Sequence, residues 1–291
     1  MTALPPALTI ALMGLLGLLI GSFLNVVVYR LPIMLQARWK AECAALAAES
    51  APQAAPAAAP EDAPRFDLLV PRSRCPHCEH PIAWFENIPL LSYALLRGRC
   101  SQCRAPIGLR YPLVELACGL LFAACTWQWG ATATALAHAG LCATLLTAAL
   151  IDWDTTLLPD DLTLPLLWAG LILAALQITP VRLSDALWGA VAGYGALWLV
   201  FWAFKLATGK EGMGYGDFKL LGALGAWLGW QALIPVVLIS SIIGALTGLA
   251  LKVRGGLRSG GYVPFGPFLA GAGLVVLGVG SQRVLSLFGL G

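Results

Sequence analysis

Residues 7–29 read A-L-T-I-A-L-M-G-L-L-G-L-L-I-G-S-F-L-N-V-V-V-Y and contain no charged side chain. A helix needs about 20 apolar residues to cross a lipid bilayer, so this stretch is long enough by itself. It is too long for the apolar part of a secretory signal peptide, and it lacks a small-residue cleavage site. We therefore expect residues 1–29 to form a retained first membrane helix.

The remainder of the chain has the same apolar character. The 291 residues are 59% hydrophobic and 11% charged, whereas soluble domains carry roughly 25% charged residues. The pattern predicts an all-α polytopic membrane protein whose partner is the lipid bilayer and not nucleic acid, and it leaves the oligomeric state open. No internal repeat is apparent. About eight membrane-spanning helices are expected, at residues 7–29, 112–130, 132–151, 162–179, 185–204, 218–231, 233–251 and 263–280.

The distribution of positive charge predicts the orientation of these helices. Ten of the 18 lysines and arginines lie between Arg30 and Arg110, and loops rich in these residues stay in the cytoplasm. When eight helices are threaded alternately from a cytoplasmic first loop, the segments that hold Asp152 and Asp217 fall on that same cytoplasmic side.

A polar insert, residues 30–111, separates the first two predicted spans, and residues 112–291 follow as a membrane domain. Within the insert, residues 41–64 are rich in alanine and proline. We expect them to form an extended or disordered linker, because this composition cannot bury a core. Residues 70–111 carry cysteines and are expected to be compact.

Four cysteines in the insert form two C-x2-C pairs. Two such pairs at this separation are typical of a tetrahedral zinc site, since each turn offers two thiolates. Four thiolates leave no open coordination position, so the metal would be structural. His77 and His80 stay open as alternative ligands, and a chance cluster or a redox pair is the other interpretation. The predicted zinc ligands are Cys75, Cys78, Cys100 and Cys103.

Two aspartates at the borders of apolar runs are the candidate catalytic groups. Asp152 lies seven residues before Pro159, and Asp217 ends the stretch G-M-G-Y-G-D. A carboxylate at the edge of the hydrocarbon layer is costly and marks a functional site. Two carboxyl groups held close together share one proton, so that one acts as general acid and the other as the base that activates water. Alternatively Asp217 caps a helix and Asp152 is a solvated loop residue, and Asp154 is as well placed by composition.

Two other functions fit the same residues. A proton-coupled transporter would relay protons through the aspartates, and a membrane scaffold would use the zinc module to bind a partner. A transporter would carry polar residues at the middle of the bilayer, whereas these carboxylates lie at its edge.

The G-x-G-D element with a second border aspartate resembles the intramembrane aspartyl proteases, and the other motifs narrow the resemblance to the bacterial type IV prepilin peptidases. Together the matching stretches cover most of the chain in order. They are residues 21–32, 75–78, 86–92, 97–103, 151–165, 212–231 and 264–269.

This resemblance implies a bifunctional enzyme of the bacterial inner membrane, with its active site facing the cytoplasm. It would cut the basic leader from prepilins and from type II secretion pseudopilins, then methylate the new amine with S-adenosylmethionine. Asp152, preferred over Asp154, and Asp217 would be catalytic. Candidate cofactor-binding residues lie in the first cytoplasmic region, for which turn chemistry around the cysteine pairs is the alternative interpretation. They are Glu86, Asn87 and Gly98.

Overall fold

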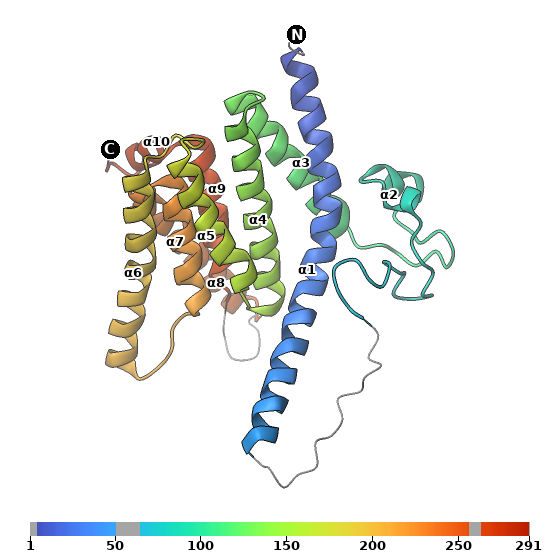
Figure 1. The fold of residues 1–291 in the computed structure, drawn as a ribbon, viewed down its shortest axis with the longest axis horizontal. Coiled ribbons are helices and arrows are strands. Elements are labelled where there is room, and N and C mark those ends of the chain that lie inside the picture. The colour runs from blue at the N-terminus through green and yellow to red at the C-terminus, as the bar shows by residue number, and fades with distance from the viewer. Residues whose placement is uncertain (1–4, 51–64, 256–262, 291) are drawn as a thin grey trace. The chain divides into compact units, whose positions relative to one another are not determined.

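The computed structural model describes residues 5–50, 65–255 and 263–290. In that part of the chain every regular element is a helix, so the expected all-α class is confirmed (Figure 1). The chain divides into two compact units, one made of residues 1–14 and 121–291 and the other of residues 15–120. We call them unit 1 and unit 2.

The described residues contain ten α-helices and two short 3-10 helices. They are α1 (Pro6–Ser50), η1 (Trp84–Asn87), α2 (Leu91–Leu95), α3 (Arg110–Trp129), α4 (Ala133–Thr155), α5 (Asp160–Ala175), α6 (Leu183–Thr208), α7 (Tyr215–Leu228), η2 (Trp230–Ala232), α8 (Leu233–Val253), α9 (Gly266–Val279) and α10 (Ser281–Leu287).

Each of the eight predicted segments coincides with a helix, but fewer helices are long and apolar enough to cross a bilayer. Among the described residues α1, α4, α6 and α8 with η2 meet that criterion, and α9 with α10 would be a fifth span bent by 104°. At 1.5 Å per residue, the 14 residues of α7 extend only about 21 Å, against roughly 30 Å of hydrocarbon. The expected count of eight is therefore supported as helices but not as full-length spans.

The first helix is longer than expected. It continues through Pro32 to Ser50, so the prediction of an extended linker is wrong for residues 41–50, whereas residues 51–64 lie outside the described part. Residues 41–50 read A-E-C-A-A-L-A-A-E-S. Alanine has the highest helix propensity of all residues, and Leu and Glu are also good helix formers, so this stretch extends the helix that precedes it.

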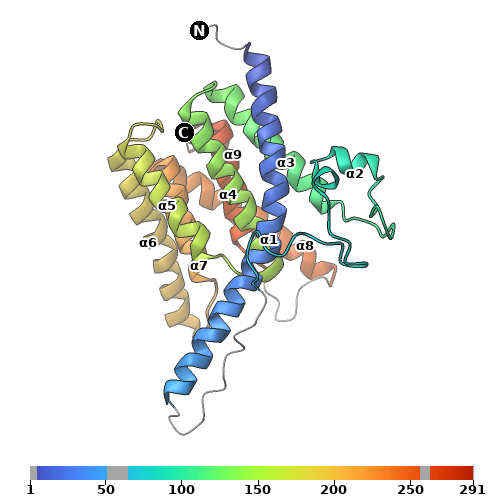
Figure 2. The ribbon, with the colours of Figure 1, turned by 45° about the vertical axis from the view of Figure 1, so that its right-hand side comes forward.

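Helix α7 forms the centre of unit 1. Ten of its 14 residues are buried, and it contacts α5, α6, α8 and α9. The views in Figures 1 and 2 agree that α6 and α7 lie side by side. Their backbones meet at Gly189 and Gly225, where a Cβ on either residue would overlap the carbonyl of the other. Glycine is required there, because close approach of backbones is what holds helices together in lipid.

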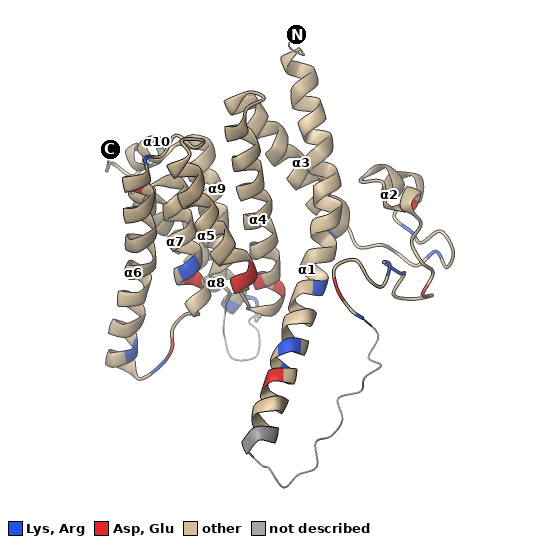
Figure 3. Ribbon diagram, in the orientation of Figure 1, with Lys and Arg blue, Asp and Glu red and all other residues tan. Residues whose placement is uncertain are grey.

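Charged side chains lie mainly at the ends of the helices of unit 1, while the middle turns are uncharged (Figure 3). This placement is expected for helices in a bilayer, since a charge near the bilayer centre is expensive.

Unit 2 is held together by contacts of α1 with the segments that follow it. The guanidinium of Arg30, 6% exposed, donates hydrogen bonds to the carbonyls of Asp67 at 2.7 Å and Pro71 at 2.6 Å. Gly21 packs so tightly on α3 that an added Cβ would lie 2.8 Å from the Cα of Glu115. The loop after residue 64 and the start of α3 are thus fixed to one helix.

Candidate active site and metal centre

Asp152 lies near the end of α4 and is buried, with 4% of its surface exposed. The helix ends just beyond it, where the amide of Thr156 donates to the Asp152 carbonyl at 2.8 Å and Thr156 adopts a left-handed conformation. The carboxylate oxygen Oδ2 accepts a hydrogen bond from the amide of Gly266, the first residue of α9, at 3.0 Å. This carboxyl group is therefore held by a segment more than one hundred residues away.

Gly266 is required for that contact. A Cβ at this position would lie 2.6 Å from Asp152 Oδ2 and 2.8 Å from Leu158 Cδ1. Any side chain would push the carboxylate away from the amide that holds it.

Asp217 lies in the first turn of α7 and is 3% exposed. The helix begins at Tyr215, three residues earlier than the sequence predicted, and Gly214 is its N-cap. The cap alternative for Asp217 is therefore wrong, since the side chain projects from within the first turn. The positive end of the helix dipole still favours an anionic side chain at this place.

Leu158 brings the two aspartates into one neighbourhood. Its side chain contacts Gly266, which holds Asp152, and a Cβ on Gly216 would lie 2.6 Å from Leu158 Cβ. The two border aspartates are thus both buried beside residues that pack on Leu158 in unit 1, whereas Asp154 is exposed.

A third acidic group near this site is neutralised. Lys219 Nζ, two residues after Asp217, lies 2.6 Å and 2.7 Å from the carboxylate oxygens of Asp160. The pair joins the second turn of α7 to the first turn of α5. Sequence analysis overlooked Lys219, although it lies only two residues from Asp217 in the chain.

Two buried carboxyl groups that lie around one side chain are suited to acid–base hydrolysis. Like charges held together in a low-dielectric site do not both ionise easily, so such a pair can keep one proton between its members. The protonated group can protonate a leaving amine, while the ionised group takes a proton from water.

The four cysteines form a compact cluster in unit 2. Their sulfur atoms all lie within 4.8 Å of one another, with Cys75 and Cys103 at 3.8 Å and Cys78 and Cys100 at 3.9 Å. Tetrahedral zinc with bonds of about 2.3 Å places its sulfur ligands about 3.8 Å apart. The donor set and its spacing therefore fit zinc. Neither His77 nor His80 belongs to the cluster.

The two cysteine loops are copies of one structure, a repeat that sequence analysis missed. Residues 73–82 read S-R-C-P-H-C-E-H-P-I, and residues 98–107 read G-R-C-S-Q-C-R-A-P-I. In each loop the first cysteine amide donates to the carbonyl five residues later at 2.9 Å, and one β-bridge closes the loop. The cysteine, proline and isoleucine residues at matching positions of the two loops are the sequence pattern that indicates this repeat.

Glu86 connects these two loops. Its carboxylate accepts from the amide of Ala83 at 2.8 Å, lies 3.3 Å from His80 Nε2 in the first loop, and accepts from the Ser101 hydroxyl in the second. The hydrogen bond from Ser101, and then that from Ala83, holds the pKa of Glu86 below its usual value. These contacts give Glu86 a structural role between the loops.

The other two predicted cofactor residues differ in their surroundings. Gly98 has φ +67°, and a Cβ there would lie 2.8 Å from Tyr93 Oη, so turn geometry accounts for it. Asn87 is exposed, and its Oδ1 lies 3.5 Å from the Ser22 hydroxyl of α1. Near these residues the buried Glu115 accepts a hydrogen bond from the amide of Leu90 at 2.9 Å.

Comparison with known proteins covers both parts of the chain. Residues 15–129 match the model of the bacterial peptidase A24 N-terminal domain, and residues 139–249 match that of the type IV leader peptidase family.

Individual relatives match over nearly the whole length. A prepilin leader peptidase/N-methyltransferase of Stutzerimonas stutzeri is 53% identical over 93% of this chain and 91% of its own. The protein of the same name from Burkholderia pseudomallei (strain 1026b) is 52% identical over 99% of this chain and 91% of its own. A third, from Pseudomonas aeruginosa, is 53% identical over 92% of this chain and 89% of its own. No solved structure matches.

Proposed function

The chain belongs to the type IV leader peptidase family, and on that basis we propose that it removes the leader peptide from prepilins and N-methylates the product. Type II secretion pseudopilins, which carry the same kind of leader, are included as substrates. The comparisons give no support to the transporter alternative. The observation that carries the peptidase proposal is the burial of Asp152 and Asp217 around Leu158, which packs against both Gly266 and Gly216.

In the proposed peptidase step these two aspartates act on the peptide bond that ends the leader. The ionised carboxyl takes a proton from water, which attacks the carbonyl carbon, and the protonated carboxyl gives its proton to the leaving amine. Either aspartate can take either role. The Gly266 amide, which donates to Asp152 Oδ2, would orient that carboxyl while its other oxygen faces the substrate.

We propose that eight helices cross the bacterial inner membrane, with residues 112–291 as the peptidase domain and residues 30–111 on the cytoplasmic side. The concentration of ten basic residues between Arg30 and Arg110 supports this orientation. Both aspartates then open to the cytoplasm, where the basic leader is retained.

The proposed zinc site consists of the four clustered cysteines, for which the sulfur spacing is the support. Bound zinc would join the two cysteine loops as a closed structural centre. Glu86 would add a second link between the same loops from outside the metal.

For the methyl donor, S-adenosylmethionine, we propose a site at Glu86, Asn87 and Gly98. Glu86 and Gly98 have close internal contacts, whereas Asn87 is exposed and its Oδ1 lies as far as 3.5 Å from the Ser22 hydroxyl, so Asn87 is the residue that can contact the donor directly. The neighbouring carboxylate of Glu115 would favour a positively charged sulfonium or amine.

Replacing Asn87→Ala should lower methyl transfer about tenfold or more while leaving leader cleavage unchanged, because a lost hydrogen bond to a charged group weakens binding by that order. The readout is transfer of labelled methyl groups to a pilin that has already been cut. Gln102→Ala is the matched control, an exposed amide in the second cysteine loop. Equal methylation by both variants would remove Asn87 from the donor site.

The proposed function is tested by incubating the purified chain with a synthetic prepilin and labelled S-adenosylmethionine. We expect a shortened product that carries the label on its new N-terminal amine. An uncut precursor that carries the label would contradict this order of reactions, because the amine does not exist before cleavage.

A further inference from the structure

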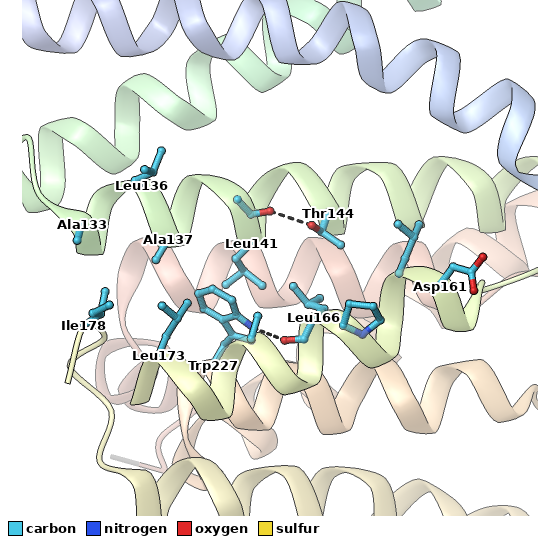
Figure 4. A pocket seen from close by; sticks show the side chains of 14 residues that line it. Ala133, Leu136, Ala137, Leu141, Thr144, Asp161, Leu166, Leu173, Ile178 and Trp227 are labelled. Carbon is cyan, nitrogen blue, oxygen red and sulfur yellow. Dashed lines mark hydrogen bonds between the residues drawn. The ribbon is translucent and has the colours of Figure 1, made fainter. Parts of the chain in front are cut away.

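A groove runs between α4 and α5 in unit 1 and has a volume of about 540 Å³. On the α4 side its lining residues recur every three or four positions and so form one face of that helix. Figure 4 shows them opposite the side chains of α5. We name this feature the α4–α5 groove. The α4 residues that line it are Ala133, Leu136, Ala137, Gly140, Leu141 and Thr144.

A hydrogen bond between helices holds the lining of the groove in place. The indole of Trp227, from α7, lies between the two helices and donates a hydrogen bond to the Leu166 carbonyl of α5 at 2.8 Å (Figure 4). Trp227 itself is only 3% exposed. The lining is apolar apart from Thr144 and Asp161, and Asp161 is its one charged residue, at the end near the α4–α5 turn.

Two helices that line the groove, α4 and α7, also carry the proposed catalytic aspartates. Asp152 lies eight residues beyond Thr144 on α4, which is about 12 Å along the helix axis. Trp227 and Asp217 both belong to α7. The acidic end of the groove therefore points toward the turn where Leu158 contacts the glycines beside both aspartates.

We propose that the α4–α5 groove binds the apolar helix of the prepilin beyond the cut bond. This inference rests on the proposed peptidase function. From Ala133 to Thr144 the α4 face is about 17 Å long, which matches about three turns of a bound helix. Apolar side chains of the substrate, spaced like those of α4, would fill the groove and orient the substrate in the membrane.

Charge determines the direction of the bound helix. Its N-terminal end lies at Asp161, since a carboxylate favours the positive end of a helix dipole. About four residues in extended conformation, at about 3.3 Å each, span the 12 Å along α4 from Thr144, the last groove residue of that helix, to Asp152.

Gly140→Trp tests this by filling the groove. A Cβ at Gly140 meets no atom within 4 Å, so the new side chain starts from open space in the groove. Gly271→Trp is the matched control, an exposed glycine of α9 with equally open surroundings and outside the groove. Each variant is assayed with a full-length prepilin and with a short peptide that spans the cut bond but lacks the apolar helix.

We expect Gly140→Trp to raise KM for the full-length prepilin about tenfold, the effect of losing one or two buried apolar contacts, with no change for the short peptide. Gly271→Trp should leave both unchanged. Unaltered KM in Gly140→Trp, or an equal loss on both substrates, would overturn the groove as the helix site. Failure of the wild-type chain to cut either substrate would instead count against the proposed function.

Photocrosslinking gives a direct measurement of the contact. A photoreactive residue at Leu136, 55% exposed at the groove, should label the apolar segment of a bound prepilin, and one at Val275, 44% exposed on α9, should not. Labelling of lipid alone at Leu136 would identify the groove as a lipid site and overturn the proposal.

Discussion

Replacing either Asp152→Asn or Asp217→Asn should lower the rate of prepilin cleavage by about 10²- to 10⁴-fold, the usual contribution of a general acid or base. Asparagine has nearly the same volume as aspartate, so the buried site keeps its packing. It can neither accept the proton from water nor supply one to the leaving amine. Cleavage is measured with a purified prepilin, and correct insertion of each variant in the membrane is measured in parallel.

Asp154→Asn is the matched control for that experiment. Asp154 lies two residues from Asp152 on the same helix, but it is exposed. We expect this variant to cleave at close to the wild-type rate. Full cleavage by Asp152→Asn with loss in Asp154→Asn would transfer the catalytic role to Asp154.

The second large effect concerns the metal. Cys75→Ser should reduce bound zinc from about one ion per chain to near zero, because a tetrahedral site with three thiolates binds far more weakly. Structural zinc contributes about 10–16 kcal/mol of apparent binding free energy in small zinc modules. Loss of the metal should therefore also unfold the two cysteine loops, which is measurable as faster proteolysis between residues 65 and 109.

Cys43→Ser provides the control for metal content. Cys43 is an exposed cysteine of α1 outside the cluster, so its replacement should leave zinc unchanged in elemental analysis of the purified protein. Retention of a full zinc equivalent by Cys75→Ser would refute the four-cysteine site.

The helices of this fold were predictable because apolar length is a local property. Each of the eight segments taken from hydropathy coincides with a helix. The error at residues 41–50 arose because these alanine-rich residues were grouped with the proline-rich residues that follow them. In the structure they continue the helix that precedes them. The number of full spans was less predictable, since α5, α7 and α9 are short and α7 is buried by its neighbours.

The candidate site was predictable only in part. The chemistry of Asp152 and Asp217 follows from their place at the ends of apolar runs. Their convergence depends on Gly266 and Leu158, and such long-range contacts leave no local pattern. Glu86 shows the same limit, because its link between the cysteine loops forms only once both loops are folded. The repeat of those loops was present in the sequence and was overlooked.

In the proposed mechanism Asp152 and Asp217 share one proton and act as a pair. The pH dependence of kcat/KM for prepilin cleavage tests it most directly, because a pair with one acid and one base gives a bell-shaped profile with two apparent pKa values that belong to the pair. We predict a bell-shaped profile that is unchanged in Asp154→Asn. A rate that changes with pH in one direction only would contradict the shared proton.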